Sequence, residues 1–301
     1  MSIQLFQSSV AGLVRVSGED ALPYLQSQLT IDLHNLPVGR TRVGLRLNLK
    51  GKVLFGAQII CTGEEDFLLI CKDAHSQTVI DLLGQNVVAD EVEFEPVPED
   101  WKEIVLYHPT SVEEACQVLG IDSILPGHAH ALGNGWVYLS SLVPPTGLTI
   151  MLPKSCPTPW ADTIASPHPG EFQRLRLQQK LFLPGREIGE DEFPQEGGLH
   201  KPSVDFNKGC YLGQEVMARI HAMGNVRKQA VAIKGTGNLE ESLPSPLLAN
   251  GKKVGSLKSQ FLLPDNENWI GAAVIHENAI EIFETKGLLI ESTGQSIYPL
   301  I

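Results

Sequence analysis

The feature that most constrains the fold is a mixture of short apolar β runs and amphipathic helices, which occurs twice before β runs continue alone. Turns around Lys50-Gly51 and Thr62-Gly63 join the middle runs of the first 110 residues into a meander, which is typical of an antiparallel sheet. We therefore predict an α+β domain over residues 1–110. Its expected β runs are 13–16, 42–49, 53–61, 67–71, 92–97 and 104–106, and its expected helices are 18–29 and 74–83.

The same pattern begins again at Ser111. A helix is predicted over 111–118, with Ser111 and Glu114 spaced as in a capping box. Residues 183–208 show no periodicity, but their prolines and glycines favour an ordered, shaped loop. These features predict a second α+β domain with a motif loop over 111–224. Its remaining expected elements are strands at 136–139 and 148–152 and a helix at 170–180.

Short β runs separated by turn residues make up the rest of the chain. Their regular spacing predicts a small β-barrel or sandwich over 225–301. The expected strands are 229–233, 252–257, 269–274, 280–283 and 288–290.

The charge balance restricts the classes of ligand. The chain has 35 acidic and 23 basic residues and a net charge of −12, which disfavours a general nucleic-acid binder. The stretch from Lys201 to Lys228 is locally cationic and could attract a small anion, or it could be an ordinary solvated face. Common nucleotide, hydrolase and metalloprotease motifs are missing from the sequence.

The sequence predicts a cytoplasmic protein with reduced thiols. The first residues lack the pattern of a secretory signal, and no apolar run approaches the length that spans a bilayer. The five cysteines are an odd number, lie far apart and include no CxxC pair. Core packing is the expected role of Cys61 and Cys71.

The segment FNKGCYLGQEVMAR, residues 206–219, carries the strongest candidate for chemistry. Cys210 precedes a predicted helix start, where unpaired amides and the cation of Lys208 would favour a thiolate. Gly209 and Gly213 would let the backbone turn tightly and approach a ligand. Two plainer interpretations remain: Cys210 as a small buried hydrophobe, and Gln214 and Glu215 as support for the first helical turn.

The run KGCYLGQE, followed by Arg219, resembles the signature of the YgfZ branch of the glycine-cleavage T-protein superfamily. The likeness extends to VSGEDALPYLQSQLTIDL, NLKGKV and RLRLQQKLFLPGREI, and so to most of the chain. It implies a three-domain ring with two intertwined α+β domains and a C-terminal barrel. It also implies folate binding and support of iron-sulfur proteins, including a radical enzyme that modifies tRNA. The motif residues that it singles out are Lys208, Gly209, Cys210, Tyr211, Gly213, Gln214, Glu215 and Arg219.

Two departures separate this chain from the transferases of that superfamily. Phe55 and Gly56 stand where a T-protein carries two aspartates, one of which contacts the reacting folate nitrogen. Neither residue can stabilise positive charge on an amine, so aminomethyl transfer is expected to be absent. Gln178 stands where the family has a pterin-binding glutamate, which removes the ionic part of that contact.

The resemblance implies folate contacts at Asn48, Phe172, Arg176 and Gln178. The helical spacing by itself favours a core aromatic for Phe172 over a folate contact. His128 and His130 form an HxH pair without further ligands nearby in sequence, so no metal site is predicted. His200 and His221 flank the motif loop as candidate proton carriers.

These observations lead to two functional hypotheses, beside the plainer interpretation of a pure scaffold in which the motif only builds the ring. The first is a tetrahydrofolate-binding accessory protein for iron-sulfur cluster assembly or repair, with Cys210 as nucleophile or transient cluster ligand. Its partners would be iron-sulfur clients or assembly factors, without direct contact to nucleic acid or membrane. The second is a folate-dependent aminomethyltransferase or demethylase of the T-protein type, which the missing aspartates at positions 55 and 56 disfavour.

Overall fold

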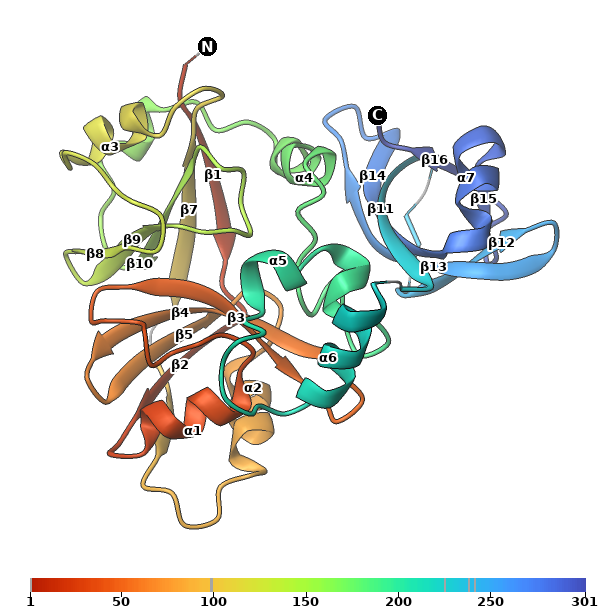
Figure 1. The fold of residues 1–301 in the computed structure, drawn as a ribbon. Coiled ribbons are helices and arrows are strands. Elements are labelled where there is room, and N and C mark those ends of the chain that lie inside the picture. Colours follow the sequence, from red (N-terminus) through yellow and green to blue (C-terminus); the bar gives the residue numbers. More distant parts are fainter. Residues whose placement is uncertain (1, 98–99, 225, 238, 241) are drawn as a thin grey trace.

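The structure is a computed structural model that describes residues 2–97, 100–224, 226–237, 239–240 and 242–301. The described chain forms two five-stranded sheets and a closed six-stranded barrel (Figure 1). This confirms the predicted α+β class and the C-terminal β-barrel. No helix in the described ranges is long and apolar enough to cross a membrane.

The first sheet has the strand order β3-β4-β5-β2-β6 and pairs its strands antiparallel. Helices α1 and α2 cover one face of it (Figure 1), where Leu25 and Val79 pack against Phe55 and Leu69. Cys61 and Cys71 are buried in or beside this core, as predicted. The elements are β2 Gly12–Ser17, α1 Ala21–Gln28, β3 Thr41–Leu47, β4 Val53–Gly63, β5 Asp66–Cys71, α2 Ser76–Gly84 and β6 Glu93–Pro96.

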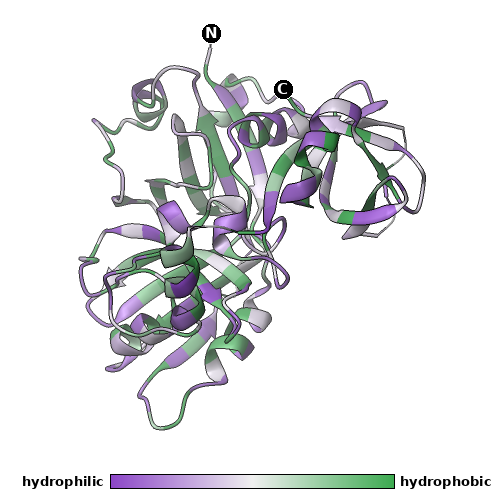
Figure 2. Cartoon of the chain, turned by 45° about the vertical axis from the view of Figure 1, so that its right-hand side comes forward, coloured by the Kyte–Doolittle hydropathy of each residue, from purple (hydrophilic) through white to green (hydrophobic). Residues whose placement is uncertain are grey.

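The second sheet has the order β1-β7-β10-β9-β8 and exchanges segments with the first. Its edge strand β1 comes from the start of the chain and pairs with β7, so the two sheets are intertwined in sequence. Figure 2 shows apolar residues along the strands of both sheets. The elements are β1 Gln4–Ser9, β7 Trp101–Tyr107, α3 Glu113–Leu119, β8 Ala129–Leu132, β9 Gly135–Leu139 and β10 Gly147–Pro153.

The barrel follows the order β11-β14-β13-β12-β15-β16, and a core around Trp269 and Phe283 fills it. Its elements are β11 Lys228–Thr236, β12 Ser245–Ala249, β13 Lys252–Leu262, β14 Asn268–His276, α7 Ile280–Lys286, β15 Leu288–Ile290 and β16 Ser296–Pro299.

A connecting region lies between the two sheets and the barrel, with α4 beside β1 of the second sheet and α5 and α6 beside the first sheet (Figure 1). Val43 and Leu45 of β3 share one apolar core with Met217 and with Ile270 of β14, so this region joins the sheet to the barrel. It confirms that 183–208 is an ordered loop with short helical turns. Its elements are α4 Pro169–Gln178, a 3₁₀ turn at Pro194–Gly197, α5 His200–Ser203 and α6 Gln214–Met223.

Two local predictions are wrong. The run 280–283 is not a strand but the start of α7, because Ile280 and Phe283 lie three residues apart on one helical face that packs on the barrel. The predicted capping box at Ser111 and Glu114 does not form: α3 begins at Glu113, with Val112 at the N-cap position and no side-chain cap. The Ser111 hydroxyl hydrogen-bonds to the Glu113 carboxylate instead. Strands β1, β8, β12 and β16 were not foreseen.

Candidate functional site

Cys210 lies on the loop that links α5 to α6, and its side chain is exposed. All five cysteines lie in described parts of the chain; three of the others are buried and Cys156 is half-buried. The interpretation of Cys210 as a buried hydrophobe is therefore wrong. An exposed thiol on this loop can meet a partner molecule without any rearrangement of the core.

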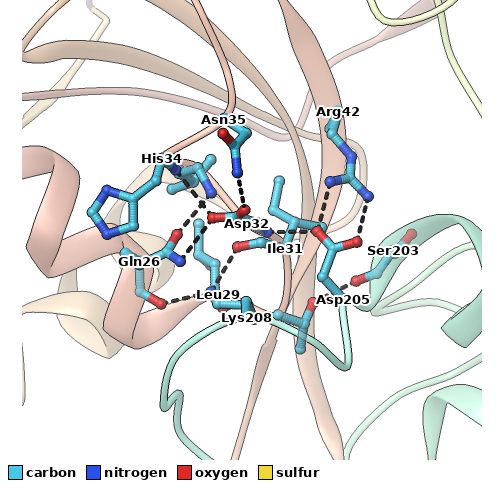
Figure 3. Close-up of polar contacts among 12 residues, drawn as sticks. Gln26, Leu29, Ile31, Asp32, His34, Asn35, Arg42, Ser203, Asp205 and Lys208 are labelled. Carbon is cyan, nitrogen blue, oxygen red and sulfur yellow. Dashed lines mark hydrogen bonds and ion pairs between the residues drawn. The ribbon is translucent and has the colours of Figure 1, made fainter.

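Lys208 anchors this loop to α1 rather than assisting the thiol. Its ammonium donates to the carbonyl oxygens of Gln26, Leu29 and Ile31, each at 2.6 Å (Figure 3). An ammonium has three hydrogens, so these three bonds leave none for a Cys210 thiolate. The arrangement also places a cation at the C-terminal end of α1, where the helix dipole favours it. The proposed help from Lys208 in forming a thiolate is thus not supported by its geometry.

Asp205 forms a second anchor that sequence reasoning missed. Its carboxylate accepts a hydrogen bond from the Asp32 amide at 2.6 Å and a bidentate pair from the Arg42 guanidinium at 2.6 and 3.0 Å (Figure 3). Bidentate arginine–carboxylate pairs fix geometry as well as adding energy. The start of the motif loop is therefore held to strand β3. The only sequence signal was the acidic residue just ahead of the motif.

Tyr211 and Gly213 hold the other end of the loop. The Tyr211 ring is buried, lies 5.3 Å from the Lys208 ammonium and has its pKa raised to about 12 by burial. Gly213 caps α6 with a φ of +85°, and an added Cβ would lie 2.7 Å from the Asn48 carbonyl oxygen. Glycine is required there for both reasons. Gly209, by contrast, has no heavy atom within 4 Å of such a Cβ.

The remaining motif residues lie on α6. Gln214 and Glu215 occupy its first turn, which leaves open the plain interpretation that they only support the helix. Arg219 is exposed and forms no ion pair with a described residue. His221 stacks on Phe206, with ring centroids 3.9 Å apart.

A cavity of about 640 Å³ is lined by residues of β3 and β4, the segment before β8, the end of β9 with the turn after it, and residues 181 and 202. This volume is in the range of small-molecule sites, which runs from roughly 300 to 1,000 Å³. Gln58, only 4% exposed, lines the cavity; its Nε2 donates to Thr41 Oγ1 at 2.7 Å, while its Oε1 is buried without a partner. A buried carbonyl oxygen of this kind needs a donor, and a ligand with N–H groups would supply one.

The four residues for which folate contacts were predicted lie in three places. Phe172 packs on Phe6 at 5.1 Å, and together with Arg176 it lines a cavity of only about 60 Å³. The Arg176 guanidinium is buried and paired with Glu187 at 2.7 and 3.3 Å. Its charge is thus already neutralised within the protein.

Gln178 and Asn48 face elsewhere. Gln178 Nε2 lies 3.4 Å from the Ile301 carbonyl oxygen, in a cavity between α4 and the barrel. Asn48 Oδ1 accepts from the amides of Lys50 and Lys52, so this side chain closes the turn between β3 and β4. The structure therefore does not gather these residues around one cavity.

Positions 55 and 56 explain why a transferase aspartate has no place here. Phe55 is fully buried in the core beneath the first sheet. On the opposite face, an added Cβ at Gly56 would lie 2.2 Å from Cγ of Pro184. A carboxylate at either position would be forced into packed apolar surroundings without a partner.

No group of three or more His, Cys, Asp or Glu side chains that could hold a metal ion is found in the part of the chain that the structure describes. His128 and His130 have ring centroids 6.2 Å apart. Burial lowers the pKa of His200 from its ordinary value, so this imidazole is mainly neutral at pH 7.

Comparisons with known proteins agree with the fold. Residues 1–123 match the family model of the GCVT N-terminal domain. The aminomethyltransferase of Moorella thermoacetica is 26% identical over 289 residues, which cover 90% of this chain and 78% of that protein. A putative chloroplastic transferase of Arabidopsis thaliana is 25% identical over 287 residues, which cover 91% of this chain and 65% of that protein.

Among solved structures, the chain is similar to the glycine cleavage system aminomethyltransferase T from Bartonella henselae. The TM-score is 0.73 at 17% identity, and the match covers 99% of this chain and 85% of that chain. The protein therefore has the T-protein fold, and its relatives are aminomethyltransferase-like.

Proposed function

We propose that this protein binds a tetrahydrofolate and uses the Cys210 thiol in the assembly or repair of iron-sulfur clusters on client proteins, as in the YgfZ branch of the superfamily. The observation that carries the proposal is the exposed thiol on a loop anchored at Lys208 and Asp205. In this role the thiol loses its proton to solvent, and the thiolate then binds one iron of a cluster in place of a partner's ligand. Clusters normally take four protein ligands, so a partner has to supply the others.

The cavity of about 640 Å³ that Gln58 lines, which we call the wide cavity, is the site that we propose for the pterin ring. Gln58 Oε1 would accept a hydrogen bond from a pterin N–H, which satisfies the one polar atom of this side chain that is buried without a partner. When bound, tetrahydrofolate supplies a carrier for one-carbon units. The positions of Phe172, Arg176 and Gln178 remain a competing prediction for the same ligand.

Calorimetry with tetrahydrofolate separates these two locations. Gln58→Met removes the acceptor at similar volume, so we expect the Kd to rise by about five- to thirtyfold, which corresponds to roughly 1–2 kcal/mol. Gln178→Met is the matched control and should bind like the wild type. The reverse outcome would assign the pterin to the neighbourhood of Gln178.

The thiol is tested by complementation in cells that lack their own copy of such a protein, with tRNA methylthiolation as the readout. Cys210→Ala should fail to restore it, whereas Cys156→Ala, which alters the half-buried thiol, should succeed. Full restoration by Cys210→Ala would contradict the proposal.

The relatives favour a second candidate, a folate-dependent aminomethyltransferase or demethylase. The packing of Gly56 against Pro184 counts against it, because the position of the family aspartate is closed. Purified protein, tetrahydrofolate and an aminomethyl donor should yield no methylene-tetrahydrofolate above the uncatalysed level. A useful rate of formation would make this candidate the better one.

A further inference from the structure

A second cavity, of about 510 Å³, lies at the C-terminal end of α6, beside the start of β11. Four apolar residues, which we call the floor, and four basic residues, which we call the rim, line it together with His276 and the buried Glu196. The floor residues are Phe193, Ile220, Met223 and Val226, and the rim residues are Lys52, Arg219, Arg227 and Lys228. We call this feature the basic cleft.

The four rim cations share the cleft with one carboxylate, that of the buried Glu196, which attracts Lys52 and Lys228 without an ion-pair contact. None of them forms an ion pair with a described aspartate or glutamate. Lys52 and Lys228 donate only to the Asp191 carbonyl oxygen, at 3.0 and 3.4 Å. On a chain with a net charge of −12, four cations against one carboxylate around one hollow still make a local positive field that attracts anions.

The apolar part of the cleft is open to solvent through α6. Six of the ten residues of this helix are exposed, and only Met217 is fully buried. Met223, its last residue, lines the cleft and is 70% exposed. An exposed apolar hollow with a charged rim resembles the anatomy of a protein–protein interface, where an apolar anchor is surrounded by polar contacts.

The occupant that fits best is a protein segment rather than a nucleic acid. Nucleic-acid sites offer aromatic faces for base stacking, but the Phe193 ring is already covered by the Lys52 ammonium, 3.2 Å from its centroid. Aliphatic floor residues instead suit an aliphatic anchor side chain.

We propose that the basic cleft docks an acidic segment of a partner protein, with an aliphatic side chain of that segment inserted between the four cations. The inference rests on the proposed function, since the partner would carry the cluster that meets Cys210. Helix α6 has ten residues and therefore spans about 15 Å between the Cys210 loop and the cleft. A partner docked along its exposed face would reach both.

The test is site-specific photo-crosslinking of the full-length protein in cells. A photoreactive residue is placed at Met223 or, as a matched control, at Leu289, which is also exposed but lies on β15 of the barrel. We expect a protein adduct at Met223 whose crosslinked segment has more acidic than basic residues. A synthetic peptide of that segment should then bind the purified protein, and salt should weaken the binding.

The second part of the experiment reverses the charge of two rim residues. Arg219→Glu combined with Arg227→Glu should remove the adduct and raise the peptide Kd at least about tenfold. Lys252→Glu combined with Lys253→Glu makes the same change in net charge on exposed residues of β13 and should alter neither. Unfolding midpoints confirm that both variants are folded.

Three results would overturn the docking surface: equal adducts at Met223 and Leu289, an RNA adduct at Met223, or an adduct that survives charge reversal. The same variants are scored for tRNA methylthiolation, which separates the two proposals. If the cleft variant restores methylthiolation and Cys210→Ala does not, the docking surface is wrong and the thiol role stands. If Cys210→Ala restores it, the proposed function fails whatever the adducts show.

Discussion

Replacing Gly56 by alanine tests whether the position of the transferase aspartate is closed. The new Cβ would lie 2.2 Å from Cγ and 2.7 Å from Cβ of Pro184, and 3.1 Å from Leu45 Cδ2. Carbon atoms pack at about 3.5–4.0 Å, so the proline ring has to move by more than about 1 Å. The loop that carries it is held by Glu187, whose carboxylate accepts from the Leu183 amide at 2.6 Å, and cannot move freely.

Inserting a carbon into a packed core costs about 1–3 kcal/mol, and the short contacts place this case in the upper half of that range. Chemical denaturation of the wild type and Gly56→Ala should therefore differ by about 2–3 kcal/mol in the free energy of unfolding. Gly84→Ala is the control, because its Cβ would meet no heavy atom within 4 Å at the end of α2. Alanine there should be neutral or stabilising by up to about 1 kcal/mol.

A double-mutant cycle identifies the clash itself. Pro184→Gly removes both of the closest atoms, so adding Gly56→Ala to that variant should cost less than it does in the wild type. If Gly56→Ala unfolds with the wild-type free energy, position 56 has room for a side chain. The structural argument against aminomethyl transfer would then fail, and Gly56→Asp would become a reasonable route to that activity.

Three further predictions concern stability and coupling. Glu187→Leu leaves the Arg176 guanidinium buried without its carboxylate and should lower the free energy of unfolding by about 3–5 kcal/mol, measured by denaturation. Burial lowers the pKa of Lys208 from 10.5 to about 8, so the unfolded chain binds this proton more tightly than the folded chain does. The free energy of unfolding of the wild type, relative to that of Lys208→Met, should therefore rise between pH 8 and 10.5. If this difference in free energy falls with pH, the pKa of Lys208 is not lowered. Tetrahydrofolate should slow alkylation of Cys210 by iodoacetamide in the wild type but not in Arg42→Met, as followed by mass spectrometry; equal slowing in both would exclude a link through Arg42.

Local patterns predicted most of the strands and helices because the periodicity of apolar residues reports which face of an element is buried. They failed where one pattern fits two structures, as at Ile280–Phe283, whose apolar spacing suits both a strand and one face of a helix. They also gave no warning of contacts between distant segments. The Asp205–Arg42 pair joins residues 163 positions apart, and the contact of Gly56 with Pro184 likewise depends on the assembled fold.

In the candidate site, too, local features could be predicted from the sequence, whereas contacts between distant segments could not. The motif around Cys210 could be found in the sequence because it resembles a family signature. The exposure of Cys210 could not be predicted, since exposure depends on where the loop is anchored. The charge of Lys208 suggested help for the thiol, yet its three carbonyl partners lie at the C-terminal end of α1 and just beyond it, about 180 residues earlier in the chain. As a single polar residue in an apolar run, Gln58 carries no sequence signal of a ligand site. Only its unpaired side-chain oxygen in a cavity identifies it as a candidate ligand contact.

Arg42 physically connects the two halves of the proposed function. Its side chain lines the wide cavity, while its guanidinium holds the Asp205 carboxylate at the start of the Cys210 loop. A ligand that presses on Arg42 therefore acts on the same bidentate pair that positions the thiol-bearing loop, and ordering of one end favours ordering of the other. Because coupling of this kind is reciprocal, a partner bound at Cys210 should also tighten the binding of tetrahydrofolate. Under the proposed function, folate bound in this cavity would therefore regulate the thiol without contacting it.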